Sequence, residues 1–162
     1  KKYCLDYLLD SKEKFKVVNM RLEHIFGEYD SENKFVTNVL YQLINNKTEI
    51  FLTEGLQKRD FIYIDDVVDA YLKVLENSSK LDKFTEFGVG RGNSITVRYF
   101  VELLFEITKS NSELKFGALP IREGEIQDST ANLDGLIELG WKSNYDLKSA
   151  ISKLVDIEKK SK

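Results

Sequence analysis

Apolar positions along the chain follow two periodicities, one typical of strands and the other typical of helices. Short apolar or β-branched runs predict strands at 15–20, 49–53, 61–64, 84–89 and 114–116. Apolar residues at helical spacing predict helices at 2–13, 35–44, 66–76, 97–107, 133–139 and 147–159. Because strands alternate with helices, and no repeat or linker interrupts them, the pattern predicts one unit of the α/β class.

Polar residues between these segments predict where helices begin and where loops lie. Asp65 is expected to cap the helix 66–76, and Ser94 or Thr96 is expected to cap the helix from Val97. The polar stretch 21–32 is expected to be a loop. The buried side of the helix 66–76 is expected to carry the apolar residues Val67, Val68, Ala70, Tyr71, Val74 and Leu75.

Composition narrows the class of protein. The 162 residues are 42% hydrophobic and 12% aromatic, enough for a core, and the net charge of −3 gives no bulk attraction to nucleic acid or an anionic membrane. No apolar run approaches the roughly 18–20 residues of a membrane-spanning helix. One cysteine, Cys4, predicts a reducing, cytoplasmic location and is expected to be a packing residue. The chain opens Lys-Lys-Tyr without Met, which suggests a missing beginning.

Several residues could carry chemistry. The glycine-rich turn 88–92 lacks the G-x-G-x-x-G spacing, since position 93 is Asn, and is expected to be a structural turn. Arg59 and Arg122 each offer a fork that matches phosphate oxygens, or are solvated surface residues. His24 could bind substrate, move protons or be an ordinary loop residue, and it has no partners at metal-ligand spacing, so no metal is expected. Glu125 could accept hydrogen bonds from sugar hydroxyls or be solvated.

Four ordered motifs resemble a known family. Residues 55–68 (GLQKRDFIYIDDVV) resemble the stretch G-x-Q-x-R-D-F-I-Y-V-D-D-V-V of extended short-chain dehydrogenases/reductases that act on nucleotide sugars. Residues 20–27 resemble the L-R-x-x-N-V-Y-G segment of that family, and residues 87–94 resemble its N-x-G-x-G-x-x-x-S segment. Residues 120–125 resemble its P-x-R-x-G-D/E segment, and Leu-Gly-Trp at 139–141 matches the L-G-W motif near the end of family members. Within the family, the run 18–24 looks most similar to CDP-abequose and CDP-paratose synthases.

The resemblance implies a role for several residues. Arg59 and Arg122 would hold the substrate diphosphate, and Glu125 would accept from the nucleotide ribose. His24 stands where the wider family usually has a substrate-contacting Asn, and it would bind substrate too. Lys34 and Phe35 would begin the helix that covers the sugar, and Phe51 would lie near the base. Glu23 would contact the cofactor, as would Lys1, the candidate for the lysine of the catalytic Tyr-x-x-x-Lys motif; Lys2 is the other candidate for that lysine.

The resemblance also implies an architecture and a function. It implies the C-terminal part of a Rossmann-type NAD(P)-dependent enzyme, with residues 1–30 as the last helix and strand of the Rossmann part and 31–162 as mainly the substrate-binding subdomain. The expected reaction is reduction of a 4-keto nucleotide sugar with NADP or NAD, and a CDP-deoxysugar is favoured. A 4-epimerase or 4,6-dehydratase is the alternative, and a non-catalytic binding module is the alternative of another class. The chain lacks the family's cofactor loop and catalytic tyrosine, so it is expected not to catalyse alone and to leave part of its apolar surface uncovered. Members of the family often form homodimers, so a homodimer is a further expectation.

Overall fold

The computed structural model describes residues 2–11 and 14–160, and these form alternating helices and short strands. Lys1 lies outside the described residues, and so do the side chains of Lys2 and Cys4. The elements, in chain order, are α1 (Lys2–Ser11), β1 (Val17–Leu22), β2 (His24–Phe26), α2 (Phe35–Ile44), β3 (Glu49–Phe51), β4 (Lys58–Arg59), β5 (Phe61–Tyr63), α3 (Ile64–Glu76), the 3-10 helix η1 (Ser78–Lys80), β6 (Phe84–Val89), β7 (Ile95–Thr96), α4 (Val97–Thr108), β8 (Glu113–Lys115), β9 (Asp128–Ser129), α5 (Asp134–Glu138) and α6 (Leu147–Lys160).

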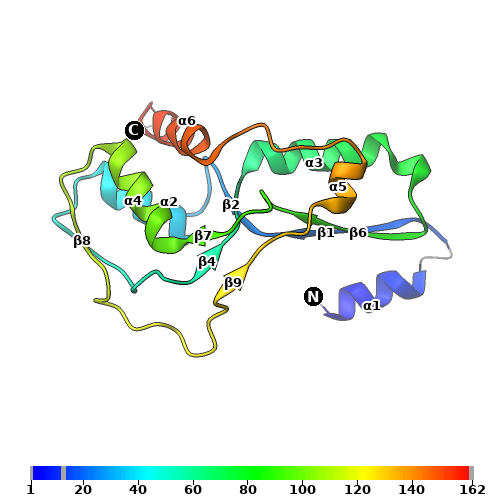
Figure 1. Cartoon of the computed structure of the whole chain (residues 1–162), viewed down its shortest axis with the longest axis horizontal. Coiled ribbons are helices and arrows are strands. Elements are labelled where there is room, and N and C mark those ends of the chain that lie inside the picture. Colours follow the sequence, from blue (N-terminus) through cyan, green and yellow to red (C-terminus); the bar gives the residue numbers. More distant parts are fainter. Residues whose placement is uncertain (1, 12–13, 161–162) are drawn as a thin grey trace.

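Parallel pairing dominates the sheets, as the α/β prediction requires. β1 pairs with β6, β2 with β5 and β3 with β8, all in parallel. β4 pairs antiparallel with β7 and parallel with β9. In Figure 1, α2, α4 and α6 gather at one end of the molecule, and α3 and α5 lie beside β1 and β6 at the other. The predicted α/β class is therefore confirmed.

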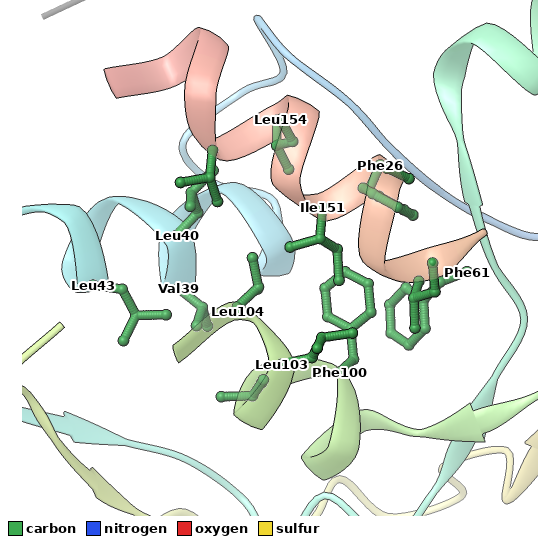
Figure 2. Close-up of a cluster of buried hydrophobic side chains, with 14 of the residues drawn as sticks. Phe26, Val39, Leu40, Leu43, Phe61, Phe100, Leu103, Leu104, Ile151 and Leu154 are labelled. Carbon is green, nitrogen blue, oxygen red and sulfur yellow. The ribbon is translucent and has the colours of Figure 1, made fainter. Parts of the chain in front are cut away.

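Two hydrophobic cores share the strand β5. Phe61 and Tyr63 belong to the larger core, which lies among α2, α4 and α6, whereas Ile62 between them belongs to the smaller core under α3 and α5. Successive side chains of a strand point to opposite faces, so this three-residue strand contributes to both cores at once. In the larger core, Phe100 stacks on Phe61 with ring centroids 3.9 Å apart (Figure 2).

The segment 21–32 was expected to be a loop, and this expectation is wrong for its first part, 21–26, whereas 27–32 form a loop as expected. β1 runs on to Leu22, and residues His24–Phe26 form β2 against β5. The backbone N–H of His24 also donates to the carbonyl of Asp60. β2 has only three residues and begins with an exposed histidine, so its alternation of polar and apolar residues is too short to be recognised in the sequence. The strand forms because it pairs with β5.

Asp65 does not cap the helix that follows β5. α3 begins at Ile64, its N-cap residue is Tyr63, and no side chain makes the cap hydrogen bond. The Asp65 carboxylate instead pairs with Lys153 of α6 at 2.6 Å. Asp66 is fully buried and accepts hydrogen bonds from the side chain of Ser143 and the backbone of Asn144. Both acidic residues therefore bind the C-terminal part of the chain.

One face of α3 is exposed, contrary to the expectation for three of its residues. Val67, Ala70 and Val74 are buried as expected. An apolar stripe of Val68, Tyr71, Leu72 and Leu75 is exposed instead. These positions are spaced i, i+3, i+4 and i+7, so they form one continuous face of the helix. Part of the apolar surface thus lacks cover.

At α4 the structure decides between the two expected caps. The side chain of Thr96 accepts a hydrogen bond from the backbone of Tyr99 at 3.1 Å, so Thr96 rather than Ser94 caps this helix. Trp141 is buried in the smaller core. The first strand is shifted from the expected 15–20 to Val17–Leu22, because its partner β6 begins opposite Val17.

Candidate functional site

A cavity of about 1070 Å³ opens where several strands and loops end together. Its wall includes the start of β2, the beginning of α2, the end of β3, β4, and the segment 117–127 between β8 and β9. Small-molecule sites typically occupy about 300–1,000 Å³, so this cavity has the size for a ligand as large as a nucleotide sugar. Every expected site residue other than Lys1 lines it: Glu23, His24, Lys34, Phe35, Phe51, Arg59, Arg122 and Glu125.

Arg59 lies in the wall of this cavity and is nearly fully buried. It is part of β4, and its burial rules out the alternative that it is a solvated surface residue. Its Nη1 donates to the carbonyl oxygens of Lys58 at 2.7 Å and Ile126 at 2.6 Å, and its Nη2 forms an ion pair with Glu125. Arg122 is exposed on the segment 117–127 and lines the same cavity. The fold therefore brings together two arginines that are far apart in sequence.

His24 is the first residue of β2, and its ring meets Phe61 edge-on at 5.9 Å between centroids. The pKa of His24 is lowered from its ordinary value of 6.5, first because partial burial of the ring disfavours its charged form and then because of the positive charge of Arg59. The imidazole is therefore neutral at pH 7, and can offer a ligand one hydrogen-bond donor and one acceptor.

Apolar side chains form another part of the wall. Phe35 opens α2 and Phe51 ends β3, and both rings are about half exposed although they are large and hydrophobic. Leu119 and Ile121 of the segment 117–127 line the cavity and are similarly exposed. Lys34, the N-cap residue of α2, adds a cation beside Phe35. Exposed aromatic rings beside cations suit a ligand that joins a flat base to anionic groups.

Glu23 lies between β1 and β2 and lines the cavity. Its carboxylate accepts a hydrogen bond of 2.6 Å from the side chain of Ser129 in β9. Its backbone N–H donates to Val89, the last residue of β6. Glu23 therefore follows the carboxyl end of a parallel strand pair, where open α/β sheets bind their ligands.

The glycine-rich turn after β6 is structural, as expected. The buried carboxylate of Asp60 accepts hydrogen bonds from the backbone N–H groups of Arg91 at 2.8 Å and Gly92 at 2.9 Å. A Cβ atom at Gly90 would lie 2.3 Å from an oxygen of Asp60, so the turn needs glycine there. Because Asp60 already occupies these amides, they are not available to a phosphate.

One stretch of the wall, Gly27 to Asp30, was not expected from the sequence. Tyr29 has a positive φ of 58°, and its backbone N–H donates to the buried carboxylate of Glu158 in α6. Glu28 accepts from the hydroxyl of Tyr63 at 2.7 Å. The only local signal is Gly27 followed by polar residues; the partners of the stretch come from 35 and 129 residues away along the chain.

Among the residues that the structure describes, no group of three or more His, Cys, Asp or Glu side chains is placed to hold a metal ion. No helix in the described ranges is long and apolar enough to cross a membrane.

Comparison with known proteins adds to this geometry. A family model, the NAD dependent epimerase/dehydratase family, matches residues 1–90, more than half of the chain. The chain belongs to this enzyme family. It is 41% identical over 140 residues to a CDP-abequose synthase of Salmonella typhimurium, a match that covers 85% of this chain and 47% of that protein. It is 26% identical over 153 residues to the dTDP-D-glucose 4,6-dehydratase of Mus musculus, covering 91% and 42%.

Solved structures share this architecture. The UDP-glucose 4-epimerase of Thermotoga maritima, solved with UDP-glucose, superposes with a TM-score of 0.83 at 26% identity, covering 99% of this chain and 52% of that one. RMD of Pseudomonas aeruginosa, solved with NADPH, superposes with a TM-score of 0.81 at 19% identity, covering 99% of this chain and 53% of that one, which shows the fold alone. The chain of this family member spans about half the length of the curated relatives it matches.

Proposed function

We propose that this chain forms the substrate-binding part of an NAD(P)-dependent enzyme that modifies nucleotide sugars, and that its substrate is a nucleoside-diphosphate sugar. The reaction we favour is reduction of the 4-keto group of a CDP-deoxysugar. The observation that carries the proposal is the convergence of eight expected site residues, from five separate stretches of sequence, on one cavity. The 41% identity to a CDP-abequose synthase supports the choice of CDP-deoxysugar.

Each part of such a substrate has a chemically suitable partner in the cavity. Arg122 and Arg59 bind the diphosphate, since guanidinium groups match phosphate oxygens in a bidentate fashion. Glu125 accepts hydrogen bonds from the ribose hydroxyls, and the exposed ring of Phe51 packs against the base. The neutral ring of His24 binds the sugar or its phosphate.

The sugar lies nearer the beginning of α2, where Lys34 and Phe35 cover it. Glu23 suits the hydroxyl groups of a cofactor ribose, because its carboxylate accepts hydrogen bonds at the carboxyl end of β1. A nicotinamide cofactor supplies or takes up a hydride when bound. The residues of this chain bind and orient the sugar for that exchange. We assign 1–30 to the last helix and strand of the Rossmann part and most of 31–162 to substrate binding, and Lys1 to the catalytic lysine.

A titration of the protein with CDP, UDP, dTDP and GDP tests the proposal. Arg122→Ala should weaken binding of the preferred diphosphate about tenfold or more, because it removes a charge-assisted contact. Arg21→Ala is the matched control, since Arg21 is exposed, pairs with Glu86 and lies outside the cavity. Equal affinity of the wild type and Arg122→Ala, or binding of none of the four nucleotides, would count against a nucleotide site.

A 4-epimerase or 4,6-dehydratase is the second candidate reaction. It is favoured by the superposition on an epimerase that holds UDP-glucose and by the sequence similarity to a dehydratase. Oxidation of NADPH by a 4-keto sugar nucleotide would support the reductase. Redox-neutral conversion of a UDP- or dTDP-hexose would support the second candidate.

A further inference from the structure

Glu158 is a carboxylate of the C-terminal helix α6 that is only 3% exposed and is bonded to the wall of the cavity. One of its oxygens accepts from the backbone N–H of Tyr29 at 3.0 Å, and the other accepts from the hydroxyl of Tyr41 at 2.8 Å. Burial of a carboxylate costs free energy unless hydrogen bonds compensate it. No described residue of α6 lines the cavity, so Glu158 can act on the site only through the residues that it binds.

The backbone of Tyr29 adopts a conformation that a tyrosine rarely takes. Its φ of 58° lies in the left-handed region, which is uncommon for residues other than glycine. The side chain of Tyr29 is 79% exposed, so packing of its ring does not account for this conformation. The hydrogen bond from its N–H to the buried carboxylate of Glu158 therefore stabilises the left-handed turn.

This turn belongs to the linker 27–34, which joins β2 to α2 and has few other attachments. Most hydrogen bonds of the linker are local turns. Within the described ranges, two hydrogen bonds tie it to parts of the chain beyond β2 and α2. One is the bond from Tyr29 to Glu158, and the other is the bond from the hydroxyl of Tyr63 to Glu28. Loss of Glu158 would thus remove one of two attachments.

The linker forms the wall of the cavity beside the beginning of α2. Its residues 27–30 line the cavity, and so do Lys34 and Phe35, where the proposed function places the sugar. The proposed partners of the diphosphate, Arg59 and Arg122, come instead from β4 and from the segment after β8. A shift of the linker would therefore change the space for the sugar and leave the diphosphate end of the cavity in place.

We infer that Glu158 is a positioning residue for the sugar: from α6 it holds the stretch 27–30 of the cavity wall in the shape that accepts the sugar part of the substrate. The inference rests on the proposed function. It assigns α6, which lies outside the cavity, a part in choosing the ligand. The N–H of Tyr29 transmits this effect, because it is the atom of the wall that the carboxylate binds.

Glu158→Met tests this role, since methionine has a similar length, suits a helix and can be buried but accepts no comparable hydrogen bond. The dissociation constants of CDP and CDP-glucose are measured for the protein by calorimetry. The variant should bind CDP-glucose about tenfold more weakly than the wild type, the size of effect typical of one lost hydrogen bond to a charged group. Its affinity for CDP should stay within about twofold.

Two matched variants separate positioning from a general loss of stability. Glu158→Gln keeps an oxygen for the N–H of Tyr29, and its NH₂ can donate to the hydroxyl of Tyr41, so it should bind CDP-glucose nearly as the wild type does. Tyr41→Phe removes the other hydrogen bond of Glu158 but keeps the one to the wall, and its affinity for CDP-glucose should stay within about twofold.

Circular dichroism verifies that each variant is folded. Glu158→Asp, which withdraws the carboxylate by one methylene group, replaces Glu158→Met should the latter not fold. Unchanged binding of CDP-glucose, or an equal loss for both ligands, would overturn the inference, as would the same loss in Tyr41→Phe. Failure of the wild type to bind CDP would instead overturn the proposed function.

Discussion

Asp60 is the residue whose replacement most sharply tests how the turn after β6 is held. Its carboxylate is fully buried and accepts three backbone hydrogen bonds, from Arg91 at 2.8 Å, Gly92 at 2.9 Å and Ala131 at 3.2 Å. Asp60→Asn keeps the size of the side chain but exchanges one oxygen for an NH₂ group. In its better orientation the amide keeps its oxygen toward Gly92 and Ala131, and its NH₂ then faces the N–H of Arg91.

The magnitude follows from these contacts. Leaving one buried N–H without an acceptor costs about 1–3 kcal/mol, and two bonds to a charged acceptor become weaker bonds to a neutral one. Relief of the cost of burying a charge offsets part of this loss. We expect the free energy of unfolding to fall by about 2–3 kcal/mol, which for a chain of this size lowers Tm by roughly 4–12 °C.

Urea unfolding followed by tryptophan fluorescence measures this change, because Trp141 is the single tryptophan and is buried in the smaller core. Asp128→Asn is the control: Asp128 is about half exposed, and its ion pair with Lys58 is 4.0 Å long. Such exposed pairs contribute less than about 1 kcal/mol. An Asp60→Asn midpoint that shifts no further than that of Asp128→Asn, at an equal slope of the transition, would show that the Asp60 carboxylate does not hold this turn.

Two further predictions concern the core and the cavity. Phe100→Ala should destabilise the protein by about 3–5 kcal/mol in the same assay, since Phe100 is fully buried on Phe61, and a loss under about 1 kcal/mol would contradict the packing described. His24 has a lowered pKa, so the folded protein binds its proton less readily than the unfolded chain does. Its contribution to the free energy of unfolding is complete above pH 6.5 and is lost as the pH falls. Between pH 7.5 and 5.5 the wild type should therefore lose more stability than His24→Asn, and equal losses would show that the histidine is not coupled to folding.

Local signals in the sequence located most of the secondary structure. The helix 35–44 and the strand 84–89 were expected at the bounds that the structure shows, because each has a long, regular apolar pattern. Elements that depend on distant partners were missed. β2 exists because it pairs with β5, and β4 because it pairs with β7 and β9. Asp65 looked like a helix cap because a local acidic residue usually is one, but Lys153 and Tyr145 of the C-terminal part bind it.

The sequence predicted which residues belong to the candidate site but not how their side chains are arranged. The motif 55–68 marked Arg59, and the motif 120–125 marked Arg122 and Glu125. That Arg59 is buried and paired with Glu125 depends on the pairing of β4 with β9, which brings together two side chains that lie 66 positions apart in the sequence. The hydrogen bond from the backbone N–H of Tyr29, in the cavity wall, to Glu158 of α6 was likewise hidden, because the two residues lie 129 positions apart in the sequence.

By itself the sequence determined the class of fold, most helices and strands, and which side chains carry charge and hydrogen-bonding groups. These depend on periodicity and residue chemistry, which are local properties. Only the tertiary structure decided which of those groups meet. The two cores on either side of β5, the pairing of Arg59 with Glu125 and the exposure of one face of α3 all arise from packing between distant segments. No local sequence pattern predicts such packing, because its free energy arises from contacts between two segments and cannot be inferred from either segment alone.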